Sequence, residues 1–165
     1  MCLPVGGMVE TSMLHLFCRR RERVSNNGNL SEEILSTKNE RRYINLPDRR
    51  GNLPFSDAVF TGDTLYVAGR IGFRPGTTQV PDDAAEEAKL MLDGVRSVLT
   101  EAGLSMNDFV YVQIFCSDVS LFDTFNQVYR QYFSGDLPAR AFIGSGPLLF
   151  GARFELIGTA VRRSK

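Results

Sequence analysis

Apolar residues recur at steps of three and four positions between residues 82 and 102, a spacing typical of one face of an amphipathic helix. Asp82 and Asp83 suit the positive end of a helix dipole, and Gly103 can adopt the left-handed conformation that ends a helix. We therefore predict a helix from Asp82 to Ala102. Its buried face would comprise Ala88, Met91, Leu92, Val95, Val98, Leu99 and Ala102.

A second helical pattern follows residue 120. The sequence Ser-Leu-Phe-Asp at residues 120–123 fits a capping box, and aromatic and aliphatic residues then recur at helical spacing up to Ser134-Gly135. This pattern predicts a helix with an apolar face formed by Phe122, Phe125, Val128, Tyr129, Tyr132 and Phe133.

Residues 109–116 alternate with the period of two that is typical of a β-strand. One predicted face carries Val110, Val112, Ile114 and Cys116, and the other carries Phe109, Tyr111, Gln113 and Phe115. Because both sets are largely apolar, we expect a strand that is covered on both faces.

The other predicted strands flank these helices. Residues 57–60 and 64–69 form a hairpin around Gly62-Asp63, since a Gly-Asp pair supports the positive φ of a tight turn. Residues 73–78 contain Pro-Gly and read as a loop. Residues 42–46 can be a strand, and residues 141–144 and 154–161 close the chain as strands. The resulting order, β-β-α-β-α-β-β, predicts an α+β fold with both helices on one face of a mixed sheet.

The first 40 residues differ in pattern from the rest of the chain. A short apolar patch precedes the Arg-rich run at residues 19–23, which is the reverse of a secretory signal. The acidic residues Glu10, Glu22, Glu32 and Glu33 argue against an organelle transit peptide. We interpret residues 1–40 as a disordered or translation-start-dependent extension and residues 41–165 as a single domain.

Composition narrows the functional classes. Lys plus Arg equals Asp plus Glu at 19 each, so the protein lacks the net positive field that attracts nucleic acid. No apolar stretch approaches the roughly 18 to 20 residues of a membrane helix. The three cysteines lack metal-ligand spacing, and His15 is the single histidine, so no metal site or histidine-based hydrolase is expected. We expect a soluble cytoplasmic protein with reduced thiols.

Two charged residues near the C-terminus are candidates for chemistry. Arg140 follows Pro138-Ala139 between a predicted helix and strand, and its planar guanidinium suits two-point binding of a carboxylate. Glu155 lies at the start of the last strand and faces away from Phe154 and Leu156. On residue type alone, an arginine and a glutamate at such strand positions more often form an ordinary ion pair than a catalytic site.

Five sequence blocks give a more specific indication. They are Leu-Pro-Phe-Ser-Asp-Ala-Val at 53–59, Leu-Tyr-Val-Ala-Gly-Arg-Ile at 65–71, Val-Tyr-Arg-Gln-Tyr-Phe at 128–133, Leu-Pro-Ala-Arg at 137–140 and Phe-Glu-Leu-Ile-Gly-Thr-Ala-Val at 154–161. In order and spacing they resemble the Rid (YjgF-type) family of imine deaminases, often labelled endoribonuclease L-PSP. The resemblance covers about residues 43–163.

The resemblance implies a chorismate-mutase-like fold that assembles as a homotrimer with three clefts between subunits. It implies that Arg140 holds a substrate carboxylate, that Glu155 positions the attacking water, and that Asn126 matches the family's helix asparagine. The implied reaction is hydrolysis of 2-aminoacrylate-like enamines and imines to 2-keto acids and ammonia, with no cofactor.

This chain departs from the family pattern at the implied substrate contacts. Phe55 stands where a tyrosine is frequent, Arg70 follows Gly69 where a glutamine is common, and Ala141-Phe142 replaces a Ser-Cys pair. These changes imply a narrower or differently charged pocket. A non-catalytic module that binds small carboxylates through Arg140 therefore stays open as an alternative. A ribonuclease or translation inhibitor, as relatives have been labelled, is a third alternative, against which the zero net charge and the lack of a histidine pair argue.

Overall fold

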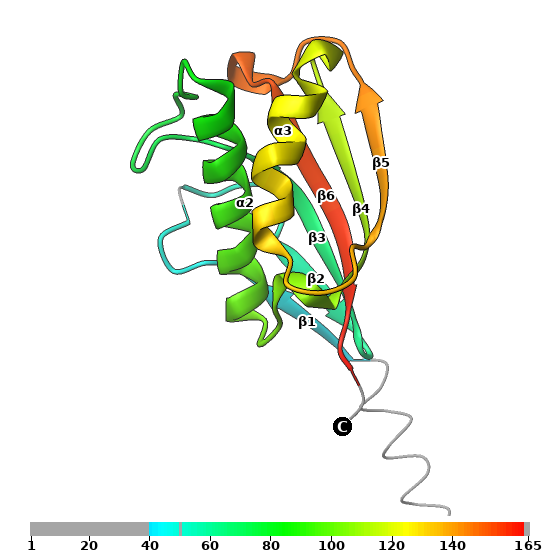
Figure 1. The fold of residues 1–165 in the computed structure, drawn as a ribbon. Coiled ribbons are helices and arrows are strands. Elements are labelled where there is room, and N and C mark those ends of the chain that lie inside the picture. The colour runs from blue at the N-terminus through cyan, green and yellow to red at the C-terminus, as the bar shows by residue number, and fades with distance from the viewer. Residues whose placement is uncertain (1–39, 50, 164–165) are drawn as a thin grey trace, which may run out of the picture. The chain divides into compact units, whose positions relative to one another are not determined.

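The computed structural model describes residues 40–49 and 51–163, which form one six-stranded sheet with two helices on one face (Figure 1). The sheet order is β1-β2-β3-β6-β4-β5. The strands are β1 Arg41–Ile44, β2 Ala58–Thr61, β3 Thr64–Ile71, β4 Phe109–Cys116, β5 Ala139–Gly144 and β6 Phe154–Val161. The helices are α2 Ala84–Glu101 and α3 Phe122–Tyr129, and short 3₁₀ turns lie at Met106–Asp108, Val119–Leu121, Arg130–Tyr132 and Leu149–Gly151.

The pairing confirms the predicted mixed sheet. β4 and β5 run parallel and are joined through α3, whereas every other neighbouring pair is antiparallel. The β2–β3 hairpin turns at Gly62, whose φ is 57°. The strand predicted at residues 42–46 forms as β1 and pairs with β2, so three strands precede the first helix, one more than the predicted element order contained.

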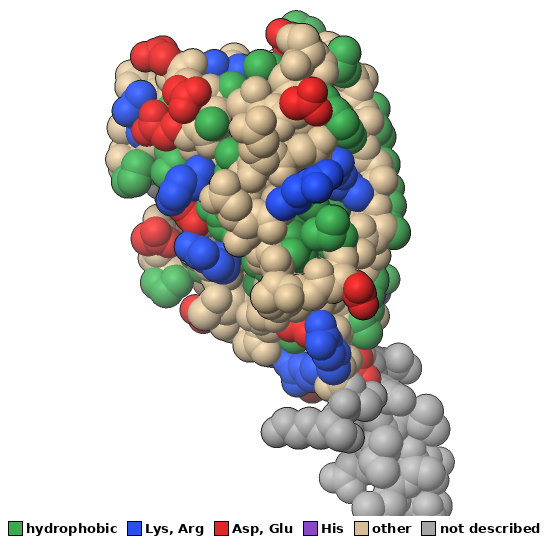
Figure 2. Space-filling view, in the orientation of Figure 1, with side chains coloured by type: hydrophobic (Ala, Val, Ile, Leu, Met, Phe, Trp, Pro, Cys, Tyr) green, Lys and Arg blue, Asp and Glu red, His purple; other side chains and the backbone are tan. Residues whose placement is uncertain are grey.

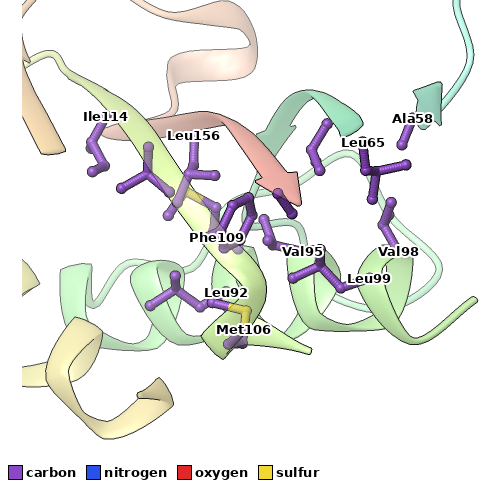
Figure 3. Close-up of a cluster of buried hydrophobic side chains, with 14 of the residues drawn as sticks. Ala58, Leu65, Leu92, Val95, Val98, Leu99, Met106, Phe109, Ile114 and Leu156 are labelled. Carbon is purple, nitrogen blue, oxygen red and sulfur yellow. The ribbon is translucent and has the colours of Figure 1, made fainter. Parts of the chain in front are cut away.

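Helix α2 forms where its apolar period predicted it. The Asp83 side chain accepts hydrogen bonds from the backbone of Ala85 and Glu86, and Gly103 has a φ of 77° just beyond the helix end. All seven residues of its predicted apolar face are buried. They point toward sheet residues that include Phe109, Ile114 and Leu156, and together these side chains form the core (Figure 3).

The alternation predicted for residues 109–116 is wrong at its start. The register between β4 and β6 shifts between Phe109 and Tyr111, so Val110 is an extra residue in a β-bulge. The bulge turns Phe109 into the core at 5% exposure and leaves Val110 49% exposed. Tyr111 is also exposed, so one face of β4 is uncovered in a single chain.

The predicted capping box at residues 120–123 is also wrong. Asp118 accepts hydrogen bonds from the Ser120 backbone and hydroxyl, which starts a 3₁₀ turn at Val119, and α3 continues from that turn at Phe122. These hydrogen bonds hold the pKa of Asp118 below its usual value. The Ser120 hydroxyl, which a capping box would use as an acceptor, thus donates to Asp118 instead.

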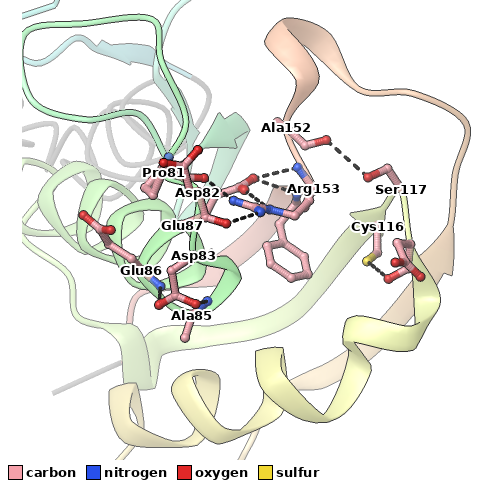
Figure 4. Close-up of polar contacts among 12 residues, drawn as sticks. Pro81, Asp82, Asp83, Ala85, Glu86, Glu87, Cys116, Ser117, Ala152 and Arg153 are labelled. Atoms are coloured by element: carbon pink, nitrogen blue, oxygen red, sulfur yellow. Dashed lines mark hydrogen bonds and ion pairs between the residues drawn. The ribbon is translucent and has the colours of Figure 1, made fainter.

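A buried ion pair ties α2 to the start of β6 (Figure 4). Glu87 is fully buried and lies 2.6 Å from Nε of Arg153, and its carboxylate also accepts the backbone N–H groups of Arg153 and Phe154. Arg153 in turn donates to the carbonyls of Pro81 and Asp82. Both ions are therefore satisfied, and the network fixes the strand that carries Glu155.

Replacing Glu87 by glutamine should lower the free energy of unfolding by about 2 kcal/mol, because a neutral amide leaves the Arg153 guanidinium with a poorly matched partner. Urea unfolding followed by circular dichroism measures this loss. Glu86→Gln on the same helix is the control, since Glu86 is exposed and its pair with Arg74 is long at 3.7 Å. Equal stability of both variants would contradict a stabilising role for the buried pair.

The proposed extension at residues 1–40 lies, apart from Glu40, outside the described residues. Within residues 40–49 and 51–163, neither helix is long and apolar enough to cross a membrane.

Candidate active site

Arg140 lies on the edge strand β5 and faces α3. Its guanidinium carbon lies 4.8 Å from the ring centre of Tyr129, 5.8 Å from that of Phe122 and 5.9 Å from that of Phe142. Burial lowers the pKa of Arg140, as does the charge of Arg130, against an opposing effect of Tyr129. Among the described residues, no carboxylate lies within ion-pair distance of this guanidinium. Arg140 is therefore a partly desolvated cation available to an external anion.

A pocket of about 190 Å³ opens beside Arg140. Asn126 and Tyr129 line it from α3, and the segment before β5 closes it. The full lining is Asn126, Tyr129, Arg130, Leu137, Pro138 and Arg140. The structure thus brings together two of the predicted site residues, Arg140 and Asn126, although they are 14 positions apart in the chain.

Glu155 lies in a second location, on the face of the sheet away from the helices. Its neighbours Phe154 and Leu156 are buried in the core, so alternation along β6 points Glu155 to the opposite side, as predicted. Gly69 of β3 lies directly beside it, and a Cβ at Gly69 would overlap the Glu155 carboxylate. The absence of a side chain at Gly69 therefore gives the carboxylate its space.

Arg140 and Glu155 do not meet within one chain. Arg140 is level with Val112 on β4, and Val112 is level with Gly158 on β6, three residues beyond Glu155. Because the single strand β4 lies between β6 and β5, the two positions are two strand spacings apart, so the offset amounts to about 10 Å along the sheet and about 10 Å across it. The two side chains also leave opposite faces, so Arg140 and Glu155 lie at two separate places in the single chain.

The Arg70 side chain does not lie beside Glu155, although Arg70 directly follows Gly69 in the chain. The register between β3 and β6 shifts between Val67 and Arg70, and this bulge turns the Arg70 side chain toward α2, where it lies beside Gly94. There it forms an ion pair with the buried carboxylate of Asp57 at 3.3 Å. The family pattern implied that Arg70 contacts the substrate. In the single chain, the Arg70 side chain instead pairs with Asp57.

Phe55, Ala141 and Phe142 lie in three different settings. Phe55 is half-exposed in the segment before β2, with the Arg49 guanidinium 5.6 Å from its ring centre. Ala141 is on the face of β5 opposite Arg140. The Phe142 ring packs on Phe125, 5.4 Å between centres, and edge-on against Phe122 at 5.0 Å. Phe142 therefore forms the wall behind Arg140.

Tyr129 is the residue of this site that the sequence interpretation assigned only to a helix face. It is 2% exposed, its ring contacts the Arg140 guanidinium, and burial raises the pKa of its hydroxyl to about 12 although the charge of Arg140 opposes the rise. Its position three residues after Asn126 is a signal that could have identified it, because residues at this spacing share one face of a helix.

The chain is similar in sequence to proteins named as deaminases. It is 37% identical over 110 residues to the 2-iminobutanoate/2-iminopropanoate deaminase of Mus musculus, covering 66% of this chain and 82% of the relative. The enzyme of the same name from Homo sapiens is 35% identical over 124 residues, covering 74% and 90%. The putative reactive intermediate deaminase TdcF of Escherichia coli is 30% identical over 112 residues, covering 66% and 87%.

Solved structures share the fold. The YjgF gene product of E. coli superposes with a TM-score of 0.69 at 29% identity, covering 74% of this chain and 99% of that one. E. coli TdcF with bound serine gives the same TM-score at 28% identity, covering 74% and 99%. Residues 49–162 match the model of the family described as endoribonuclease L-PSP, and the chain therefore belongs to this family, the one that its sequence blocks resemble.

Proposed function

We propose that the protein hydrolyses reactive 2-imino acids and their enamine tautomers to 2-keto acids and ammonia. The carrying observation is the Arg140 guanidinium, which is partly desolvated, surrounded by three aromatic rings and unpaired among the described residues. The names of the relatives, 2-iminobutanoate/2-iminopropanoate deaminase and reactive intermediate deaminase, support the assignment.

The reaction places modest demands on the protein. The carbon of a C=N bond is electrophilic, so water can add to it when the substrate is held in place and a base accepts the water proton. In this proposal Arg140 binds the substrate carboxylate through its two parallel N–H groups, and Glu155 accepts the proton. Glu155 returns this proton to the substrate nitrogen, and the resulting carbinolamine then loses ammonia and leaves the keto acid, so the reaction needs only water and these side chains.

The active site in this proposal forms between copies of the chain. Because Arg140 and Glu155 leave opposite faces of one sheet, one substrate can contact both only when the Arg140 edge of one copy lies against the Glu155 face of another. Exposed apolar side chains on the strands, namely Tyr66, Val110, Tyr111 and Ile143, offer a surface for such contact. A contact between two different patches forms a closed ring when its rotation is a whole fraction of a turn, and we propose the homotrimer implied by the family resemblance.

The proposal does not include RNA cleavage, despite the family's description. The chain carries 19 basic and 19 acidic residues, and both kinds are spread over the face drawn in Figure 2. A mixed surface of this kind lacks the continuous basic track that binds a phosphate backbone.

We also propose that the protein is located in the cytoplasm.

A coupled assay tests the proposal. A dehydratase generates 2-iminobutanoate from threonine or 2-iminopropanoate from serine, and keto-acid release is followed with and without this protein. We expect faster release with the protein present. No acceleration, together with tight binding of a small carboxylate, would instead support a non-catalytic binding module.

Replacing Arg140 by alanine should weaken substrate capture at least tenfold, because each charge-assisted hydrogen bond to a carboxylate contributes about 1.5 to 3 kcal/mol. Arg140→Lys should recover part of the loss, since it restores the charge but not the planar fork. The measurement is kcat/KM in the coupled assay. Arg96→Ala is the control: Arg96 also lies over a tyrosine ring, 5.3 Å from Tyr132, but is exposed and pairs with Asp93. Full activity of Arg140→Ala would remove Arg140 from the site.

A further inference from the structure

Tyr129 carries a buried hydroxyl that has no hydrogen-bond partner among the described residues. The residue ends α3 and is 2% exposed, with its ring stacked on Phe125 at 5.7 Å and tilted against Phe133 at 4.7 Å. A phenylalanine would make the same ring contacts without burying a polar atom. The fold alone therefore gives no reason for the hydroxyl.

The nearby Tyr132 shows the usual arrangement. Its hydroxyl donates to the Asp93 carboxylate at 2.8 Å and lies 3.1 Å from the carbonyl of Lys89. Tyr132 therefore links the 3₁₀ turn after α3 to helix α2. A buried polar group without a partner is unfavourable, and such groups are rare in folded proteins. The contrast between the two tyrosines indicates that the Tyr129 hydroxyl is left for a partner outside the folded chain.

The position of Tyr129 indicates what that partner is. Tyr129 lines the 190 Å³ pocket together with Asn126 and Arg140, and its ring lies 4.8 Å from the Arg140 guanidinium. Arg140 is close enough for its charge to act on the phenol. A carboxylate offers about four lone-pair positions, and the two N–H groups of an arginine fork occupy only two of them.

We propose that the Tyr129 hydroxyl donates a hydrogen bond to the substrate carboxylate held by Arg140, which makes Tyr129 a substrate-binding residue. This inference rests on the proposed function, because it assumes the same bound carboxylate. Binding then converts a buried, unpaired hydroxyl into a paired one, so the ligand removes an unfavourable feature of the free protein. The ring of Tyr129 at the same time keeps the guanidinium in place.

Tyr129→Phe tests the inference, because it deletes the hydroxyl and keeps the ring. We expect the melting temperature to stay the same or rise, the calorimetric Kd for 2-oxobutanoate to increase about tenfold, and KM in the coupled assay to increase similarly. Tyr132→Phe is the matched control. It should lower the melting temperature by losing the bond to Asp93, while Kd and KM stay unchanged.

Two results would overturn the inference: Tyr129→Phe binding 2-oxobutanoate as tightly as the wild type with the same KM, or its melting temperature falling as far as that of Tyr132→Phe. Failure of the proposed function looks different. In that case the wild-type protein itself neither accelerates keto-acid release nor binds 2-oxobutanoate.

Discussion

Replacing Glu155 by glutamine should lower kcat for imine hydrolysis about a hundredfold while ligand affinity changes by less than about twofold. Glutamine keeps the shape of the side chain and its place beside Gly69 but cannot accept a proton from the attacking water. In the proposed site, the substrate carboxylate is bound by Arg140 of another copy, and its charge-assisted hydrogen bonds to that guanidinium are unchanged in this variant. The loss should therefore be confined to the chemical step.

Steady-state kinetics in the coupled assay, together with calorimetric binding of 2-oxobutanoate, separates these two effects. Glu101→Gln is a suitable control, because Glu101 is an exposed glutamate at the end of α2 and should behave as the wild type. A variant with Glu155→Gln that keeps full kcat, or that loses binding and activity together, would show that Glu155 is not the proton acceptor.

Much of the fold is readable from the sequence because its two helices and most of its strands carry strong periodic patterns. The seven-residue apolar face of α2, the Asp83 cap and the terminating Gly103 all agree with one another, and the structure confirms them. The hairpin at Gly62 is equally local, since a two-residue turn between β-prone segments leaves few alternatives.

The β-bulges escaped prediction for a physical reason. A bulge adds one residue to a strand, and which residue is extra depends on the partner strand rather than on the local sequence. At Val110 the bulge reversed the predicted faces of Phe109 and Val110, and between Val67 and Arg70 it turned Arg70 toward Asp57. Strict alternation therefore assigned Phe109 and Val110 to the wrong faces, whereas Arg70, which the family pattern implied as a substrate contact, pairs with Asp57.

The chemistry of the site was only partly accessible from the sequence. Helix spacing places Asn126 and Tyr129 together, but only the packing of β5 against α3 shows that both share a pocket with Arg140. The separation of Arg140 from Glu155 was not visible either, because the faces they occupy depend on strand order and register. An unpaired hydroxyl such as that of Tyr129 appears only when every buried partner is known.

Mixed oligomers of Arg140→Ala and Glu155→Gln chains should recover activity that neither variant has alone. If each site takes Arg140 from one copy and Glu155 from another, a Glu155→Gln copy supplies an intact arginine and an Arg140→Ala copy an intact glutamate. Random assembly from equal amounts should then restore about a quarter of the sites. If both residues acted within one chain, every site would lack one of them and mixing would restore none.

The variants are unfolded and refolded together, or co-expressed with different tags, and keto-acid release is compared with that of the separately refolded proteins. Wild type mixed equally with the double variant is the decisive control. Sites shared between copies again leave about a quarter intact, whereas sites within one chain would leave about half. Equal recovery in the two mixtures therefore supports the shared site. The contrary result would be half of the wild-type activity in the mixture of wild type with the double variant, and no activity in the mixture of the two single variants. That result would place the whole site in one chain and contradict a site shared between copies.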